Sequence, residues 1–324
     1  MQYLEYIIVG SGISALITYQ NKLNTKVLSH HISNKKLAYK RIYNFNEYKG
    51  IGGNSNVWGS YINIDELAQL YENKNFYNFI KNNKLFDITK VSKNIDFSDV
   101  GFLSNKNSNQ IFRITKKMFD NNLENFNLSK IAILKDQIKL IGEKKNYIGS
   151  KINLCIGNLE LLKILYKSNL IKANDIISFK DGKVKYKIYF GINKNKYNFS
   201  IPMSPNEIIS KFIFSRSLRY NDNDFLRNLI IQEYNNESIE FKFRASEIIN
   251  YKKKSFLSNI FNRFYRNYFF TDHVCNLRVN NIPIQKLINQ YSENIIINSS
   301  GILKEYISGP ISQNLIYNAY MNSL

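Results

Sequence analysis

Apolar residues at the start of the chain form two runs separated by a glycine-containing turn. The first run ends at Val9, and the turn contains Gly10 and Gly12. The first run, over residues 4–9, has the length of a buried strand, and the second, over residues 13–23, favours a helix. A short apolar stretch at residues 26–28 completes a strand–helix–strand unit, which predicts a parallel sheet.

Three apolar stretches in the middle of the chain predict short strands in succession. They cover residues 131–134, 138–141 and 151–156, and the polar residues between them favour turns. Such a meander, leading to a final apolar strand that ends at Gly157, is a common extension of a nucleotide-binding sheet. Helices are predicted over residues 64–85 and 159–166.

Strands are favoured from residue 171 to residue 244, most clearly at residues 183–190, where apolar side chains alternate with others. The Asp181-Gly182 pair before them predicts a hairpin turn. Residues 294–297 predict another buried strand, and residues 312–321 a closing helix capped by Ser312. The pattern predicts an α/β protein. A parallel sheet with a β-meander occupies residues 1–170 and 288–324, and a β-rich second domain occupies residues 171–287.

Charge changes this picture little. The chain has 324 residues and a formal net charge of +20, which is high enough to suggest nucleic-acid binding. The lysines are scattered, however, no nucleic-acid module is recognisable, and the sharpest basic run, residues 251–254, reads as a solvated turn. We expect no nucleic-acid partner. Attraction to anionic substrates or to a membrane surface stays open.

Two observations bear on localisation. No segment has the features of a secretory signal or the uninterrupted apolar length of a membrane span. The two cysteines, Cys155 and Cys275, do not lie in a metal-ligand pattern. We expect a soluble, cytoplasmic protein with no transmembrane segment and no metal site. The oligomeric state stays open.

The turn after the first strand has the form Gly-x-Gly-x-x-Ala. Gly10 allows a tight turn, Gly12 lets the backbone approach a pyrophosphate, and Ala15 lets the helix pack close to the strand. The phosphates would lie at the helix N-terminus, where unpaired N–H groups favour negative charge. Tight strand–helix turns without a ligand can show the same pattern, but its place after the first strand favours a dinucleotide.

A second glycine cluster, Gly-Ile-Gly-Gly-Asn-Ser-Asn-Val-Trp-Gly at residues 50–59, resembles a family motif. It is similar to the GG-[ST]-S-x-x-W-G segment of glucose–methanol–choline (GMC)-type FAD-dependent oxidoreductases, in which this loop runs along FAD. Gly52 and Gly53 would let main-chain amides face the ligand, and Trp58 would form a wall of the flavin site. The alternative is a glycine-rich surface loop with a core tryptophan.

Two later segments resemble the same family, in the same order along the chain. Residues 154–168 are similar to its strand–turn–helix segment AxGxxxTPxLLLxSG, in which the glycine at the position of Gly157 lies where the sheet meets the cofactor. Residues 294–301 are similar to its NLYVVDxS strand, in which the position of Asn298 lies near the FAD pyrophosphate. The resemblance implies a Rossmann-like FAD-binding domain and a substrate or cap domain. It also implies oxidation of a hydroxyl (CH–OH) group of a small polar substrate, such as a sugar or glycan precursor.

The resemblance also assigns roles to residues. It implies that FAD is bound by Gly10, Gly12, Ser14, Ala15, His31, Gly52, Gly53, Asn54, Ser55, Asn56, Val57, Trp58, Gly157, Asn298 and Ser299. His273 precedes the last strand, as the family's catalytic histidine does. It would accept the hydroxyl proton while hydride passes to the flavin, a task suited to the imidazole pKa. Asn314 would place an amide near the substrate oxygen. A lone histidine such as His273 is also often structural.

Three departures from the family keep a second function open. An acidic residue normally ends the second strand and binds the adenosine ribose, but the sequence there is Ser29-His30-His31. The second catalytic position has no histidine, and family members are usually much longer. The alternative is a degenerate, non-catalytic dinucleotide-binding protein that kept the scaffold. Another is a flavin- or nicotinamide-dependent enzyme that does not oxidise alcohols.

Overall fold

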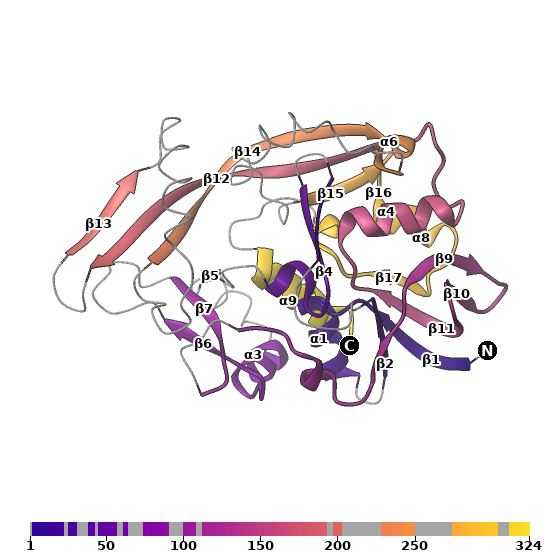
Figure 1. Cartoon of the computed structure of the whole chain (residues 1–324), viewed down its shortest axis with the longest axis horizontal. Coiled ribbons are helices and arrows are strands. Elements are labelled where there is room, and N and C mark those ends of the chain that lie inside the picture. The colour runs from indigo at the N-terminus through magenta and orange to yellow at the C-terminus, as the bar shows by residue number, and fades with distance from the viewer. Residues whose placement is uncertain are drawn as a thin grey trace.

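Figure 1 shows the computed structural model of the chain, which is organised around a seven-stranded sheet. The structure describes residues 2–22, 25–30, 38–42, 45–56, 61–63, 74–90, 100–107, 112–192, 197–202, 228–249, 274–303 and 311–324. The strands of the sheet, in spatial order, are β8 (Leu123–Asn125), β2 (Lys26–Ser29), β1 (Gln2–Val9), β11 (Asn146–Leu154), β10 (Ile138–Gly142) and β9 (Leu128–Ile133), with β17 (Ile295–Ile297) also paired to β11.

The parallel part of the sheet consists of β8, β2, β1, β11 and β17, whereas β9, β10 and β11 form an antiparallel meander. Val9 of β1 pairs with Leu28 of β2 on one side and with Leu154 of β11 on the other. Leu154 also pairs with Ile297 of β17. Four parallel strands therefore end at the same level. The predicted α/β fold, a parallel sheet with a meander, is confirmed.

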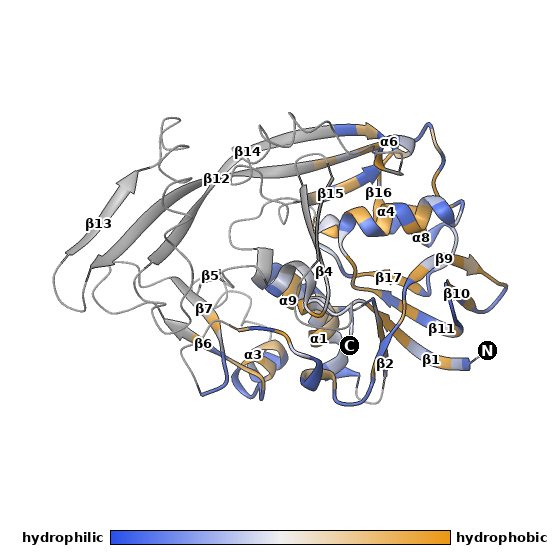
Figure 2. Cartoon of the chain, in the orientation of Figure 1, coloured by the Kyte–Doolittle hydropathy of each residue, from blue (hydrophilic) through white to orange (hydrophobic). Residues whose placement is uncertain are grey.

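Both faces of the sheet are covered. On one face, α1 (Ile13–Asn21) and α9 (Ile311–Met321) pack against each other and share a core with Ile8 of β1. On the other, α4 (Asn158–Lys167), along which hydrophobic and hydrophilic residues alternate (Figure 2), and α8 (Ile284–Asn289) share a core with Ile7 and Val9. Because the end of β1 is buried on both faces, its sequence is a continuous apolar run rather than an alternation.

A second sheet is built on two long antiparallel strands, β12 (Ile176–Ile192) and β14 (Asn228–Arg244), which extend away from the central sheet in Figure 1. Its other strands are β13 (Tyr197–Pro202), β15 (Val274–Val279) and β16 (Ile282–Pro283), and α6 (Ala245–Ile249) follows β14. Ile177 and Phe179 of β12 share the core of α4. The division of the chain into domains at residues 170 and 288 stays a prediction.

The hairpin turn predicted at Asp181-Gly182 is wrong. Both residues lie inside β12, where Asp181 pairs with Ile239 of β14 on one edge and with Val274 of β15 on the other. The register of the β12–β14 pair shifts between Gly182 and Val184. The glycine therefore marks an irregularity within a continuous strand, which is the other common role of glycine in sheets.

Two smaller sheets are present. The first contains β5 (Tyr61–Asn63), β7 (Val100–Asn105) and β6 (Phe86–Lys90), and the second β3 (Ala38–Ile42) and β4 (Phe45–Lys49). Of the helix predicted over residues 64–85, residues 64–73 lie outside the described residues, and α3 covers Lys74–Lys81. The chain turns into β6 because Asn83 Oδ1 accepts hydrogen bonds from the amides of Leu85 (2.9 Å) and Phe86 (3.3 Å).

Helix α9 begins one residue before the predicted start. Its first residue is Ile311, so Ser312 lies in the first turn rather than before the helix. The predicted role of Ser312 as the N-cap is therefore wrong, because an N-cap residue precedes the first helical residue.

One carboxylate connects several strands. Glu124 of β8 accepts hydrogen bonds from Lys26 of β2 (2.9 Å), from Lys145 (2.7 Å) and from the hydroxyl of Tyr147 on β11. Burial alone would raise the pKa of Glu124, but these donors outweigh it and lower the pKa to about 2. The charged form of Glu124 is therefore part of the folded sheet.

We predict that Glu124→Gln lowers the free energy of unfolding by about 2–3 kcal/mol at neutral pH. Because the folded pKa lies below the unfolded value of 4.5, this contribution is present above pH 4.5 and is lost as the pH falls toward about 2. Urea unfolding across this range should show the two proteins converging in acid. Glu143→Gln, which removes one exposed carboxylate bonded to Asn127, is the control, and a constant difference at every pH would contradict the prediction.

Candidate functional site

The carboxyl ends of β1, β11 and β17 meet at one edge of the central sheet. The amide of Cys155 donates to Val9 O (2.7 Å), and the amide of Asn298 donates to Leu154 O (2.9 Å). On the other side, the amide of Gly10 donates to Leu28 O of β2 (2.8 Å). These bonds bring the predicted Gly10, Gly157 and Asn298 segments to one edge, where ligands bind in open α/β sheets.

Gly10 makes the closest approach at this edge. Its φ is +117°, and a Cβ atom there would lie 2.2 Å from the carbonyl oxygen of Cys155. Both values require glycine. Because Gly10 has no side chain, β1 stays paired with β11 through its last residue, Val9. Helix α1 can then start at Ile13, above the strand ends.

The N-terminus of α1 presents unpaired amides. Gly12 is the N-cap, and the first hydrogen bond of the helix runs from Leu16 N to Gly12 O (3.0 Å). Among the described residues, none accepts a hydrogen bond from the amides of Gly12, Ser14 or Ala15. Such a helix end favours an anion, because the amides and the helix dipole both point at it.

The second glycine loop, residues 50–56, packs directly on this helix end. The amide of Gly52, whose φ is +79°, donates to Ser11 O (3.1 Å). Ser55 Oγ accepts a hydrogen bond from the amide of Ile13 (3.0 Å) and lies 3.2 Å from the position of a Cβ on Gly12. The structure therefore brings the two glycine motifs together, as the sequence predicts for a common ligand.

Asn56 holds the second loop in place. Its Nδ2 donates to Ile51 O (2.9 Å) and to Ile114 O (2.8 Å), and its Oδ1 accepts from the amide of Ile114 (2.7 Å). The carboxamide thus pairs with the backbone of residue 114 as a neighbouring strand would. We read Asn56 as a residue that positions Gly52 and Ser55, whereas the sequence predicted direct contact with FAD.

The end of β2 is uncharged. Ser29 occupies the end of the strand, where an acidic residue normally binds ribose, and its hydroxyl donates to Ser11 Oγ (2.9 Å). Both side chains are buried. The next strand does carry a carboxylate, Glu124, but Lys26 and Lys145 pair with it. Hydroxyl groups therefore connect the end of β2 to the first glycine loop.

The loops after β11 and β17 are joined by Asn158, a residue that the sequence did not single out. Its Oδ1 accepts from Ser299 Oγ (2.7 Å) and from the amide of Gly301 (3.1 Å), and its Nδ2 donates to Ser300 Oγ (2.8 Å). The signal in the sequence was its position directly after Gly157, at the start of a predicted helix. Ser299 is thus bonded within the protein, and Gly157 is exposed with open space around it.

Asn298 has an unpaired donor. The residue is 2% exposed, its Oδ1 accepts from Asn322 Nδ2 (2.6 Å), and its Nδ2 has no hydrogen-bond partner among the described residues. A buried amide without a partner costs about 1–3 kcal/mol, so such groups are rare in proteins and call for an explanation. A ligand that offers an acceptor would remove this cost.

A buried polar network supports the strand ends. Asn153 Nδ2 donates to Tyr6 OH (3.2 Å) and to Thr18 Oγ1 (3.3 Å), and Cys155 Sγ donates to Asn153 Oδ1 (3.3 Å). Burial raises the pKa of the Tyr6 hydroxyl to about 12 and also raises the pKa of the Cys155 thiol. Both groups stay protonated at neutral pH, so Cys155 is a structural residue rather than a nucleophile.

The other predicted site residues are distributed as follows. Gly53 lies in the second glycine loop, and Asn314 lies half-buried in the first turn of α9. The residues outside the described part of the chain are His31, Val57, Trp58 and His273, together with the side chain of Asn54. The structure therefore brings many of the predicted residues together at one edge of the sheet, and the proposed catalytic histidine lies outside the described residues.

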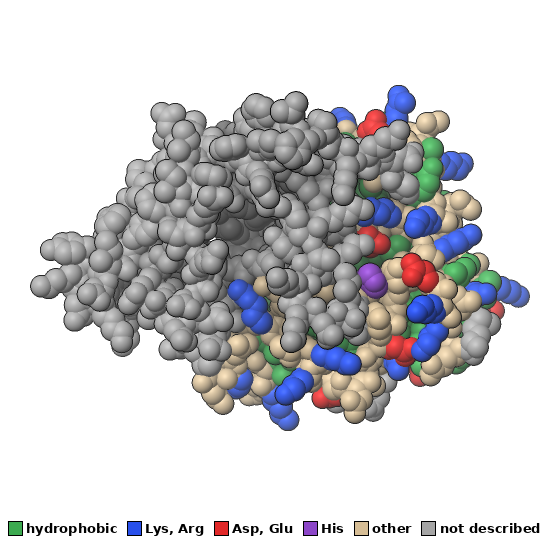
Figure 3. Space-filling model, in the orientation of Figure 1, with side chains coloured by type: hydrophobic (Ala, Val, Ile, Leu, Met, Phe, Trp, Pro, Cys, Tyr) green, Lys and Arg blue, Asp and Glu red, His purple; other side chains and the backbone are tan. Residues whose placement is uncertain are grey.

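Within the described ranges, no group of three or more His, Cys, Asp or Glu side chains is arranged to hold a metal ion. None of the helices in this part of the chain is both long and apolar enough to cross a membrane. Lysine and arginine side chains are spread over the described part of the face in Figure 3, with acidic side chains among them.

No protein-family model matches the sequence, and no characterised protein matches it by sequence. Among solved structures, the chain is similar to a ferredoxin-flavin thioredoxin reductase from Clostridium acetobutylicum, with 14% identity and a TM-score of 0.21 over 48% of this chain and 38% of that chain. It is also similar to NikD, an unusual amino acid oxidase essential for nikkomycin biosynthesis, with 8% identity and a TM-score of 0.38 over 100% of this chain and 94% of that chain. A third similar structure is the tetracycline destructase Tet(51), with 9% identity and a TM-score of 0.40 over 100% of this chain and 81% of that chain.

The chain spans 38% of the length of the thioredoxin reductase. The strand order of the central sheet, rather than these similarities, defines the fold. The resemblance to the GMC family stays a prediction.

We predict that Gly10→Ala lowers the free energy of unfolding by about 2–4 kcal/mol, because the new methyl group must displace the Cys155 carbonyl in a strained backbone conformation. Gly157→Ala is the matched control. It has open space and an ordinary φ of −61°, so its effect should stay within about 1 kcal/mol. Equal stabilities of the two variants in urea unfolding would refute the close approach at Gly10.

Proposed function

We propose that this chain binds FAD at the carboxyl ends of β1, β11 and β17 and acts as a flavin-dependent oxidoreductase. The observation that carries the proposal is the N-terminus of α1, where no described residue accepts from the amides of Gly12, Ser14 and Ala15, next to two glycine loops. The site offers donors rather than acceptors, and the pyrophosphate of a dinucleotide supplies the acceptors that it lacks.

The residues present fit this cofactor group by group. The free amides of α1 suit the pyrophosphate, and Gly52 lets the second loop pack against the first without a side chain between them. The unpaired Nδ2 of Asn298 suits a phosphate or ribityl oxygen.

The reaction that we propose is oxidation of a CH–OH group on a small hydroxylated substrate, for example a sugar or a glycan precursor. It rests on the resemblance of residues 50–59, 154–168 and 294–301 to GMC-type oxidoreductases. FAD supplies an acceptor for hydride. In this proposal His273 takes the proton of the substrate hydroxyl, and Asn314 orients the hydroxyl oxygen. Two free cysteines, both buried, are in keeping with a cytoplasmic setting.

A second candidate is a non-catalytic dinucleotide-binding protein. Two observations favour it: Ser29 stands where a ribose-binding carboxylate is usual, and the sequence has no histidine at the second catalytic position of the GMC family. The two candidates share the binding site and differ in whether bound flavin can be reduced by a substrate.

An absorbance spectrum of the purified protein, followed by FAD titration if it is colourless, tests binding. Anaerobic mixing with a panel of alcohols and sugars tests the reaction. We expect flavin bands that bleach with a substrate, and at least about 100-fold slower bleaching in His273→Ala with FAD content unchanged. Asn314→Ala should slow bleaching less. Bound flavin that no hydroxylated compound reduces would favour the second candidate, and failure to bind FAD would overturn the flavin-dependent oxidoreductase.

The unpaired amide of Asn298 gives an independent test of the binding site. Asn298→Leu has a similar volume and removes the buried unpaired donor together with the bond from exposed Asn322, so the stability without FAD should stay within about 1 kcal/mol of the wild type. If Asn298 binds FAD, the affinity for FAD should fall about tenfold.

Asn322→Ala is the control for this variant, because it removes the partner of Asn298 Oδ1 and leaves Nδ2 in place. Thermal unfolding and flavin fluorescence measure the two quantities. Unchanged affinity in Asn298→Leu would contradict the assignment of Asn298 to the cofactor site.

A further inference from the structure

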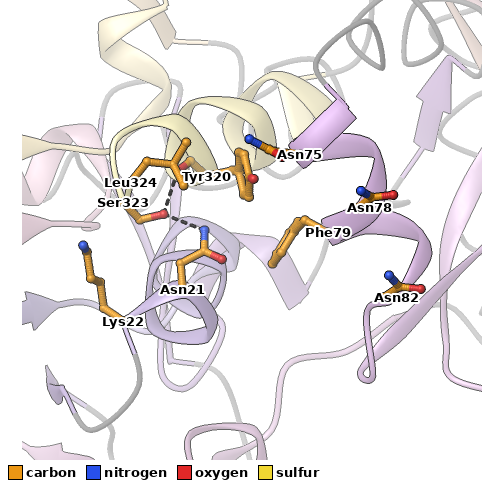
Figure 4. Close-up of a pocket in the computed structure, with 9 residues that line it drawn as sticks. All are labelled: Asn21, Lys22, Asn75, Asn78, Phe79, Asn82, Tyr320, Ser323 and Leu324. Carbon is orange, nitrogen blue, oxygen red and sulfur yellow. Dashed lines mark hydrogen bonds between the residues drawn. The ribbon is translucent and has the colours of Figure 1, made fainter.

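A separate groove lies at the opposite end of α1 from the glycine loops. It has a volume of about 600 Å³ and is formed by the C-terminal ends of α1 and α9 and by one side of α3 (Figure 4). Because α1 has nine residues that rise about 1.5 Å each, the groove is more than ~10 Å from the proposed dinucleotide site. It is a broad groove that is largely open to solvent.

A row of carboxamides follows one side of the groove. Asn75 and Asn78 lie on α3 and Asn82 directly follows the last residue of the helix (Figure 4), and their spacing of three and four residues puts them on the same side. The row is about 10 Å long. Asn78 and Asn82 are exposed, and no described residue hydrogen-bonds their side chains. Each carboxamide offers two donors and one acceptor oxygen.

An aromatic surface adjoins this row. Phe79, on the same face of α3, packs on Tyr320 of α9 with ring centroids 4.9 Å apart, and Tyr320 packs in turn on Phe76 at 5.2 Å. Asn21 Nδ2 donates to Ser323 Oγ (2.6 Å), which ties the end of α1 to the end of α9 beside these rings. The aromatic surface is thus fixed by packing, while the amides of Asn78 and Asn82 are free to meet a ligand.

The charge of the lining restricts the ligand further. Lys22 is the one charged side chain among the residues that line the groove, and no carboxylate side chain is among them. The side chains of the lining therefore offer no anionic partner to a metal ion or a cationic ligand. Paired donors and acceptors beside an aromatic ring suit a molecule that carries many hydroxyl groups on an otherwise apolar ring, since the hydroxyls bond to the amides and the ring rests on the aromatic face.

We propose that this groove binds carbohydrate, specifically an oligosaccharide whose successive sugar units follow the amide row of α3. Asn78 and Asn82 bond to its hydroxyl groups, and Phe79 supports one sugar ring. The two exposed amides are about 6 Å apart along the helix axis, one turn of α3 apart, so adjacent sugar units can each meet one amide. This site is independent of FAD and of the proposed oxidation.

Calorimetric titration of the full chain with two uncharged hexasaccharides, maltohexaose and chitohexaose, tests the proposal. We expect at least one of them to bind, and Asn78→Ala/Asn82→Ala to weaken its binding about tenfold or more. The matched control is Asn289→Ala/Asn294→Ala, which removes two exposed asparagines elsewhere on the surface and should leave the affinity unchanged.

A heparin-derived hexasaccharide, measured at low and high salt, separates carbohydrate recognition from attraction to a protein of net charge +20. Binding of heparin alone, lost at high salt, would overturn the proposal. So would the absence of binding to both uncharged sugars, or equal affinities in the wild type and the groove variant. Asn78 lies at an exposed position of α3, where alanine is well tolerated, and Asn82 is an exposed residue just after the helix. Thermal unfolding of the variant checks that it is folded.

Discussion

The arrangement of the candidate site depends on the approach of the Gly10 backbone to the carbonyl of Cys155, at a distance that excludes any side chain. This approach keeps β1 paired with β11 to the end of both strands and sets the start of α1 above them. The second glycine loop then bonds to Ser11, one residue further on. Asn298 reaches the same edge through Leu154. A bulkier residue at position 10 would push all of these elements apart.

The polarity of the edge follows from this geometry. A helix that begins above strand ends leaves its first amides without acceptors, and here Ser55 satisfies one of them and the described residues leave three others free. Asn298 adds a buried donor on the neighbouring strand. Hydrogen-bond donors therefore accumulate at this edge, where acceptors are missing. Strand β2 ends in Ser29 and contains no acidic residue that would repel an anion. The edge as a whole favours a ligand with several negatively charged oxygens.

The sequence was sufficient for elements whose signal is local. The strand–helix–strand unit, the meander and β17 have local apolar patterns ended by glycine or polar residues. Their boundaries were predicted within about three residues, except that β11 begins at Asn146 rather than at residue 151. Asp181-Gly182 has an equally local turn signal, but pairing with residues 239 and 274, distant in sequence, keeps it in a strand. The same limit applies to single side chains. Asn56 and Asn158 were ambiguous because their partners, Ile114 and Ser300, are 58 and 142 residues away.

Binding and chemistry depend on separate parts of this chain. The glycine loops, the free amides of α1 and Asn298 all act on a ligand by holding it, and a protein with no ligand would gain stability by replacing an unpaired buried donor such as Asn298 Nδ2 with an apolar group. Their presence together therefore argues for a bound dinucleotide. Oxidation adds a different demand, a proton acceptor, which the proposal assigns to His273 alone. A loss of that one group would leave the binding site intact, so the catalytic and non-catalytic candidates are one substitution apart on the same scaffold.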